Sequence, residues 1–314
     1  MSGTTGATER QATNRATPKR IAHRGFAGVY PENTLAAFEQ AMRDSGPAGP
    51  PEMVEVDVMP SADGEVVVFH DLELGRVTDA PPELADQYVW ETPYETLSEL
   101  DVLGTGETIP RLETVFDALP PEVGVNVEFK NPGSTDVRPR ENLPPGERAA
   151  QTDLWLDFAG NVVSTLSSYD NDVLVSSFAE GALAAVREVD PSIPVAAVFA
   201  ESVADGMEVA RRYDCETIHV PWNMIADTDL FNAEYDSFGP YEEVDLVEVA
   251  HRENRTVNVW TVDSWYQANQ LRRAGVDGLI TDYPGVLRFD DAEDATDAPS
   301  AADADGASAA EPRR

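Results

Sequence analysis

The second half of this chain repeats one pattern, in which a short apolar run is followed by a segment with helical spacing. Apolar runs typical of buried strands cover residues 173–177, 194–199, 216–220, 256–261 and 277–281. The spacing of apolar residues predicts helices over 180–188, 202–212, 241–253 and 264–274, and a short last helix after residue 281. Strand–helix alternation of this kind predicts a parallel sheet.

Three further strand patterns precede this repeat, at residues 20–24, 53–58 and 123–129. Adding them to the five later runs gives eight strands, so we predict an α/β fold, a closed (β/α)8 barrel of the TIM type. Helices are expected over 35–43, 112–119 and 148–168. Residues 72–107 hold few long periodic segments, and we expect them to form a small insertion after the second strand region.

The chain has 314 residues, of which 42% are hydrophobic, so it can build the core of one large domain. We expect that domain to cover residues 19–289. The lack of periodicity in residues 1–18 predicts a disordered arm, and the composition of residues 290–314 predicts an acidic disordered tail.

The acidic residues far outnumber the basic ones, 58 against 22, which gives a formal net charge of −36. Lys19 and Lys130 are the only lysines. Such a field repels nucleic acid and anionic membranes, so no nucleic-acid partner is expected. It also destabilises the compact state unless salt screens it, and at molar salt the Debye length falls to about 3 Å. We therefore predict a protein from an extreme halophile; an acidic mesophilic protein is the alternative that the lysine depletion disfavours.

Cellular location is constrained by what the sequence lacks. Cys215 is the only cysteine, so no intrachain disulfide is possible, and its sequence neighbours do not activate the thiol. No apolar run reaches the roughly 18 residues of a spanning helix, so no stable membrane insertion is expected. The N-terminal segment lacks the apolar stretch of a signal peptide. We predict a cytoplasmic protein.

Charged residues gather at the ends of three predicted strands. His23 and Arg24 end the first, Glu55 and Asp57 alternate with valines in the second, and Glu128 and Lys130 end the third. A half-buried strand usually turns its acids to solvent, but here further buried-strand patterns flank them. Because TIM-type barrels place their sites at the carboxyl ends of strands, we expect these side chains to converge there, together with His70.

This set of residues suits the cleavage of a phosphodiester. The reaction requires neutralised phosphoryl oxygens, a deprotonated nucleophile and a protonated leaving group. Carboxylates are hard ligands that hold Mg²⁺ or Ca²⁺ rather than zinc. An arginine and a lysine supply positive charge to the phosphate, and histidines near neutrality serve as base and acid.

At this point the chain closely resembles the glycerophosphodiester phosphodiesterase family, from about residue 20 to 289. The matching stretches are HRG at 23–25, PENT at 31–34, EVDV at 55–58, HD at 70–71, EFK at 128–130, WTVD at 260–263 and GVDGLITDYP at 275–284.

The resemblance implies a TIM-type barrel with an insertion and the hydrolysis of glycerophosphodiesters to glycerol 3-phosphate and an alcohol. It implies that a glycerol hydroxyl attacks phosphorus and that water then opens a cyclic phosphate. The implied roles are catalysis by His23 and His70, phosphate binding by Arg24 and Lys130, and binding of one divalent cation, Mg²⁺ or Ca²⁺, by Glu55, Asp57 and Glu128.

Several positions stay open at this stage. Trp260 either packs on the glycerol or head group or is an ordinary core tryptophan, and Ser177 and Phe178 are equally open. Glu32 either joins the metal shell or pairs with Arg24, which we favour, and His219 is expected to be a buried structural residue. The long loop at 131–146 holds Arg138 and Arg140, which can reach a substrate head group.

Two other functions are compatible with the same barrel. One is a lysophospholipase D-like or lyase activity on lysophospholipids, which the lack of an obvious apolar docking surface disfavours. The other is a catalytically inactive barrel that binds phosphoesters, which the intact histidines and carboxylates disfavour. The sequence sets neither the head group nor the oligomeric state.

Overall fold

A computed structural model describes residues 17–43, 49–236 and 238–287 of the chain. Except for residues 17 and 18, the predicted disordered arm and acidic tail lie outside the described residues. No helix within the described ranges combines the length and apolar character that crossing a bilayer requires.

Eight parallel strands close into a barrel, which confirms the predicted TIM-type fold. Neighbours in the barrel follow chain order, and the last strand pairs with the first, so that Ile21 lies beside both Met53 and Ile280. The strands are β1 (Lys19–His23), β2 (Met53–Pro60), β6 (Gly124–Phe129), β7 (Val173–Ser177), β8 (Val195–Val198), β9 (Thr217–Pro221), β10 (Thr256–Trp260) and β11 (Gly278–Thr281).

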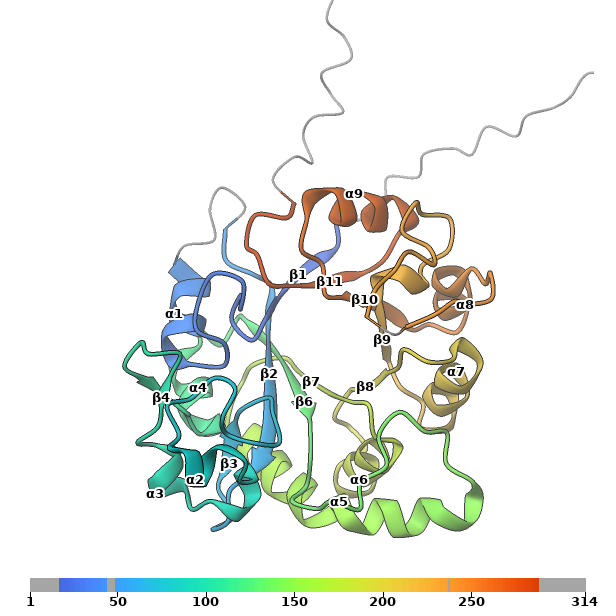
Figure 1. Ribbon diagram of the computed structural model, residues 1–314. Coiled ribbons are helices and arrows are strands. Elements are labelled where there is room, and N and C mark those ends of the chain that lie inside the picture. The colour runs from blue at the N-terminus through green and yellow to red at the C-terminus, as the bar shows by residue number, and fades with distance from the viewer. Residues whose placement is uncertain (1–16, 44–48, 237, 288–314) are drawn as a thin grey trace, which may run out of the picture.

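Helices surround the strands on the outside of the barrel (Figure 1). They are α1 (Leu35–Arg43), α4 (Leu112–Ala118), α5 (Pro145–Leu166), α6 (Glu180–Val189), α7 (Val203–Arg212), α8 (Leu246–Arg252) and α9 (Trp265–Ala274), with a short 3₁₀ turn η3 (Trp222–Met224) after β9. The main core lies between strands and helices, where the valines of β2 that point outward are fully buried. Alternation along β2 therefore turns Glu55 and Asp57 into the barrel.

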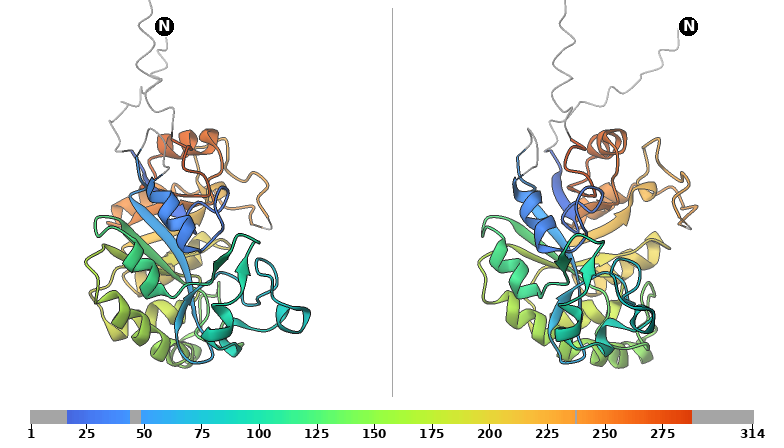
Figure 2. Two further views of the ribbon diagram at one scale, coloured as in Figure 1. Left: turned by 90° about the vertical axis from the view of Figure 1, so that its left-hand side faces the viewer. Right: turned by 60° about the vertical axis from the view of Figure 1, so that its left-hand side comes forward.

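The predicted insertion after the second strand region has an apolar cluster of its own. β3 (Val66–Val68) precedes it and pairs antiparallel with the end of β2. The insertion itself contains α2 (Pro82–Ala85), η2 (Val89–Glu91), α3 (Tyr94–Leu97), β4 (Asp101–Val102) and β5 (Glu107–Thr108). Met59, Phe69, Leu74 and Leu97 are buried in this second cluster. Figure 2 shows the segment projecting beside the carboxyl end of β2.

Two helix predictions in the second half are corrected. No short helix follows β11 within the described residues, since 282–287 form turns. Tyr283 donates its backbone N–H to Thr281 Oγ1 at 3.1 Å, and Pro284 disfavours the helical conformation for the residue before it. The helix predicted over 241–253 begins only at Leu246, where the Asp245 side chain caps it by accepting from the backbone N–H of Glu248.

Candidate active site

Three carboxylates meet inside the carboxyl end of the barrel. Glu55 and Asp57 come from β2 and Glu128 from the adjacent β6, where Asp57 and Glu128 are register partners. One oxygen from each lies within 4.8 Å of the others. Glu55 and Asp57 are 1% and 0% exposed, so burial and mutual repulsion both oppose this arrangement.

Two basic side chains and an amide offset this charge at Asp57. Lys130 Nζ lies 3.0 Å from Asp57 Oδ1 and also contacts Glu128, while Arg24 Nε lies 3.1 Å from Asp57 Oδ2. Asn33 donates from Nδ2 to the same Oδ2 at 2.8 Å. Burial would raise the pKa of Asp57, but Lys130 and Arg24 hold it well below the ordinary value. Asp57 is therefore ionised.

Glu55 lacks such compensation. Its Oε2 accepts the backbone N–H of Arg24 at 3.1 Å, but its buried Oε1 has no hydrogen-bond partner among the described residues. Burial, followed by repulsion from Asp57 and Glu128, raises the pKa of Glu55 well above its ordinary value. A cation with two charges would supply what this oxygen lacks, and three carboxylates are ligands that Mg²⁺ and Ca²⁺ both accept. The residues present therefore fit a divalent cation.

His23 stands at the end of β1, next to this cluster. Its Nδ1 lies 2.6 Å from Oδ1 of Asp282, the residue that follows β11, and its Nε2 lies 4.0 Å from Glu55 Oε2. Because a carboxylate only accepts, Nδ1 carries the proton in this pair. The Nε2 atom is then left to exchange a proton with a substrate.

His70 follows β3 and is held in the same way by its own neighbour. Its Nδ1 lies 2.6 Å from Asp71 Oδ1. Burial, together with the Lys130 ammonium, lowers the pKa of His70 below its ordinary value. The imidazole is therefore neutral at neutral pH, which leaves Nε2 with a lone pair.

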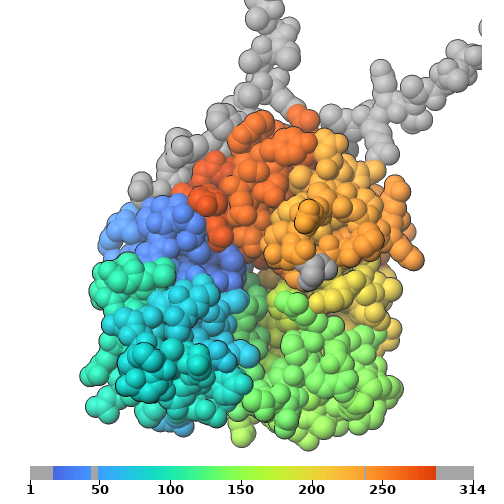
Figure 3. Space-filling view, viewed as in Figure 1, coloured from blue at the N-terminus to red at the C-terminus, as the bar shows by residue number. Residues whose placement is uncertain are grey.

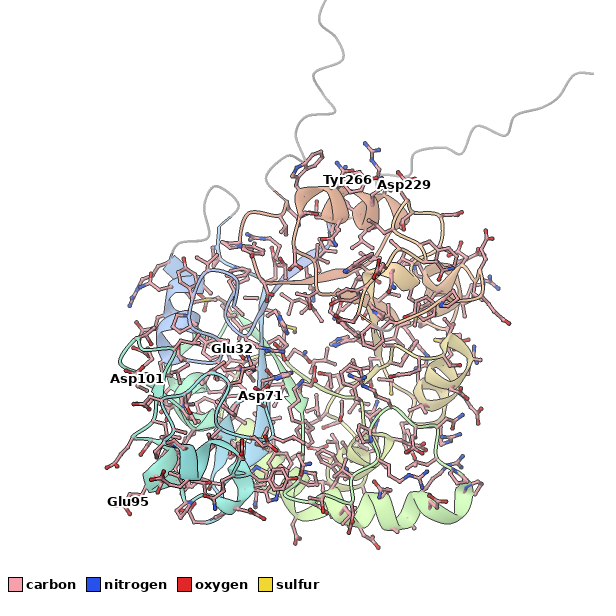
Figure 4. The ribbon with its side chains drawn as sticks, viewed as in Figure 1. Glu32, Asp71, Glu95, Asp101, Asp229 and Tyr266 are labelled. Carbon is pink, nitrogen blue, oxygen red and sulfur yellow. The ribbon has the colours of Figure 1, made fainter. Side chains whose placement is uncertain are left out.

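Arg76 connects Asp71 to the turn after β1. Its guanidinium contacts Asp71 and donates to both oxygens of Glu32, at 3.0 and 2.6 Å, and Glu32 accepts from Arg24 Nη1 at 3.0 Å. Figure 4 shows Glu32 and Asp71 close together on one side of the barrel mouth. Burial would raise the pKa of Asp71, but the hydrogen bonds from His70 and Arg76 hold it well below its ordinary range.

Aromatic side chains gather on the opposite side of the mouth, around Trp260 at the end of β10. Its ring centroid lies 5.8 Å from that of Phe178, 6.2 Å from Tyr235 and 5.7 Å from Phe238. We call these four residues the aromatic wall. In Figure 3 the blue and teal surface of the N-terminal part of the chain and the insertion meets the green surface around α5 and the orange surface of the C-terminal part across a narrow cleft.

The positions left open by the sequence are structural in their contacts. Glu32 pairs with Arg24 and Arg76, as favoured from the sequence. Ser177 donates from Oγ to the carbonyl oxygen of Phe129 at 2.8 Å, which ties β7 to β6. His219 is 1% exposed and lies inside the barrel, with Nε2 3.0 Å from Asn258 Nδ2.

Sequence reasoning missed the partners of the two histidines and the residues that support them. Asp71 and Asp282 stood within the motifs but received no role, and Arg76 and the wall residues Tyr235 and Phe238 were not found. A usable signal existed for Asp282, because an acid directly after the last barrel strand must lie beside the end of the first.

The model of one protein family, the glycerophosphoryl diester phosphodiesterase family, matches residues 23–286. The chain belongs to this family. The prediction that it is an enzyme of this class, a phosphoric diester hydrolase, is confirmed.

Relatives in sequence and in structure agree with this membership. A glycerophosphodiester phosphodiesterase of Bacillus altitudinis is 29% identical over 274 residues, 85% of this chain and 95% of the relative. A lysophospholipase D of Rattus norvegicus is 24% identical over 292 residues, 86% of this chain and 85% of that one. The structure of an Oleispira antarctica phosphodiesterase in complex with the product sn-glycerol-3-phosphate is similar with a TM-score of 0.66 and 27% identity, covering 87% of this chain and 96% of that one.

Proposed function

We propose that this enzyme hydrolyses glycerophosphodiesters to glycerol 3-phosphate and an alcohol, with one divalent cation, Mg²⁺ or Ca²⁺. One observation supports this most: two histidines, each held at Nδ1 by a carboxylate, stand beside a buried cluster of three carboxylates. The product named in the Oleispira antarctica complex is consistent with it. In this proposal Glu55, Asp57 and Glu128 hold the cation.

The two histidines carry the protons in this proposal. His70 is neutral, so its Nε2 accepts the proton of the attacking glycerol hydroxyl. His23 donates from Nε2 to the departing alkoxide, and the roles reverse when water opens the cyclic phosphate. Asp71 and Asp282 hold each ring in one tautomer and stabilise its protonated form, as the acid does in a Ser–His–Asp triad.

Arg24 and Lys130 position the phosphate. Their side chains are only 15% exposed, and ion pairs to Asp57 fix both in place. When bound, the cation withdraws charge from a phosphoryl oxygen. Fixed charges aimed at the reacting group need little reorganisation as charge develops, which favours the transition state over the bound substrate.

A lysophospholipase D activity is the second candidate, supported by the name of the Rattus norvegicus relative. The two activities break the same kind of bond and differ in the group attached to the phosphate. The binding site for that group, rather than the cation site, decides between them.

One assay tests both functions. Purified protein in molar KCl is given glycerophosphocholine, glycerophosphoinositol or lysophosphatidylcholine, with Mg²⁺, Ca²⁺ or EDTA, and released glycerol 3-phosphate and choline are measured. We expect glycerol 3-phosphate from the glycerophosphodiesters and none with EDTA. Choline released from lysophosphatidylcholine alone would favour the second candidate, and no turnover of any substrate would refute both.

The histidine roles have a separate test. We expect His23→Ala and His70→Ala each to lose roughly 10²–10⁴-fold in kcat, the span of general acid–base contributions. Near-normal activity in either variant would remove that residue from the mechanism.

We also propose that the protein comes from a salt-rich cytoplasm, on the basis of its net charge of −36. Screening relieves repulsion between like charges, so Tm should rise steadily from low to molar KCl. A Tm that does not change across that series would contradict the halophilic origin. The cytoplasmic location stays a prediction.

A further inference from the structure

Arg140 covers part of the aromatic wall. It belongs to the loop between β6 and α5, and its backbone N–H donates to the carbonyl oxygen of Phe178 at 2.8 Å. Its guanidinium carbon lies 4.9 Å from the ring centroid of Phe178 and 5.5 Å from that of Phe238. On its other side, Nη1 lies 3.4 Å from Glu201 Oε1.

Strand register places this group close to the proposed phosphate site. Glu128 on β6 is the register partner of Ser176 on β7. Lys130 and Phe178 follow two residues later, each directly after the end of its strand, so both residues lie at the same end of neighbouring strands. Arg140 therefore lies over a ring that is adjacent to Lys130, where a group attached to the phosphate would extend.

The side chains around Arg140 favour one class of head group. A quaternary ammonium is bound by open aromatic faces, and here a guanidinium already occupies the faces of Phe178 and Phe238. A second cation in the same place would meet like-charge repulsion. A polyol, in contrast, can place its C–H groups on aromatic rings and its hydroxyls between the guanidinium and the Glu201 carboxylate, which offer donors and acceptors side by side. Arg140, Phe178 and Glu201 also line one crevice, which extends toward α6 and α7.

We propose that Arg140 is a specificity-determining residue, and that the enzyme prefers glycerophosphodiesters with an uncharged polyol head group over those with a trimethylammonium head group. This inference rests on the proposed hydrolase function and adds the class of substrate.

The test compares kcat/KM for glycerophosphoinositol and glycerophosphocholine in the wild type and in Arg140→Asn. Asparagine is chosen because the residue has φ of 65°, a left-handed conformation that asparagine tolerates well. We expect the wild type to prefer the inositol substrate. In the variant the ratio of the two kcat/KM values should shift about tenfold toward choline, because the ring faces are uncovered. A ratio measured on one preparation does not depend on how much of it is folded.

Arg138→Asn is the matched control. Arg138 lies in the same loop but contacts Glu141 and Glu147 and none of the aromatic residues. In Arg138→Asn the ratio of the two kcat/KM values should stay at the wild-type value. A wild type that prefers choline, or a ratio that Arg140→Asn leaves unchanged, would overturn this inference while the hydrolase function stands. A wild type that hydrolyses neither substrate would overturn the hydrolase function and this inference with it.

Discussion

The two sides of the barrel mouth carry side chains of different chemistry. The side formed by β1, β2, β6 and the segment after β3 carries three carboxylates, two histidines and the basic groups between them, joined by ion pairs of about 3 Å. The other side, formed by the ends of β7 and β10 and the segment between η3 and α8, carries the aromatic wall. Its rings contact one another and leave the indole nitrogen of Trp260 without a hydrogen-bond partner among the described residues. We call them the charged side and the aromatic side.

This contrast separates two tasks. Charges fixed by neighbours act most strongly on a transition state, where charge changes, whereas ring faces contact substrate and transition state alike. Changes on the charged side should therefore lower kcat, and changes on the aromatic side should alter KM or substrate preference.

The largest effect is expected for Glu55→Gln on the charged side. Loss of one cation ligand should lower kcat by roughly 10²-fold or more. Because burial and like charges raise the pKa of Glu55, its ionised form destabilises the cation-free fold at neutral pH. The variant should therefore melt at a higher temperature than the wild type in EDTA, and gain less on addition of Mn²⁺. Calorimetric scans with and without the ion measure both changes, and an undiminished gain would exclude Glu55 as a ligand.

A smaller loss is expected when the carboxylates behind the histidines become amides. Asp71→Asn and Asp282→Asn keep the side-chain shape but no longer stabilise a protonated imidazole, so kcat should fall by roughly 10²-fold. The pH dependence of kcat should shift in Asp71→Asn, because the hydrogen bond from His70 to the Asp71 carboxylate raises the pKa of His70 and the variant loses that contribution. Asp117→Asn serves as a control, since that acid contacts Tyr169 far from both histidines. If both variants keep the wild-type kcat, the carboxylates of Asp71 and Asp282 have only a structural role in their loops.

On the aromatic side, Trp260→Phe should have a modest effect of another kind. The smaller ring keeps most contacts within the wall, so KM should rise by roughly two- to tenfold while kcat changes less. Steady-state kinetics with one glycerophosphodiester measures both constants. A variant that loses kcat but keeps KM would break the proposed division between the two sides.

His219, inside the barrel below both sides, should affect stability and not catalysis. Burial lowers its pKa to about 3, so between about pH 6.5 and pH 3 the unfolded chain binds a proton that the folded chain does not. The free energy of unfolding therefore falls by about 1.4 kcal/mol for each pH unit below 6.5. His219→Gln should remove this slope. Urea titrations of the wild type and the variant at pH 7.5 and pH 5 measure it, and equal slopes in the two proteins would contradict this role of His219.

The fold could be predicted from the sequence because buried parallel strands and amphipathic helices follow from local patterns. The failure after β11 is also local: Asp282 and Tyr283 lie in a turn stabilised by Thr281, and the proline after them decides the outcome. The charged side was predicted as far as its residues stand in short motifs. Arg76 and Phe238 could not be predicted, because each contacts a partner remote in the chain and neither belongs to a sequence motif.

Arg76 also constrains how this chain can change over evolutionary time. It contacts both Glu32 and Asp71, so its loss by itself would take from each acid one of its two partners, leaving Arg24 for Glu32 and His70 for Asp71. We expect that replacement of Arg76 during evolution is followed by replacement of Glu32 or Asp71 with an uncharged residue. Among relatives, the identities at these three positions should therefore vary together, and an ancestral sequence carrying one replacement without the other should be rare.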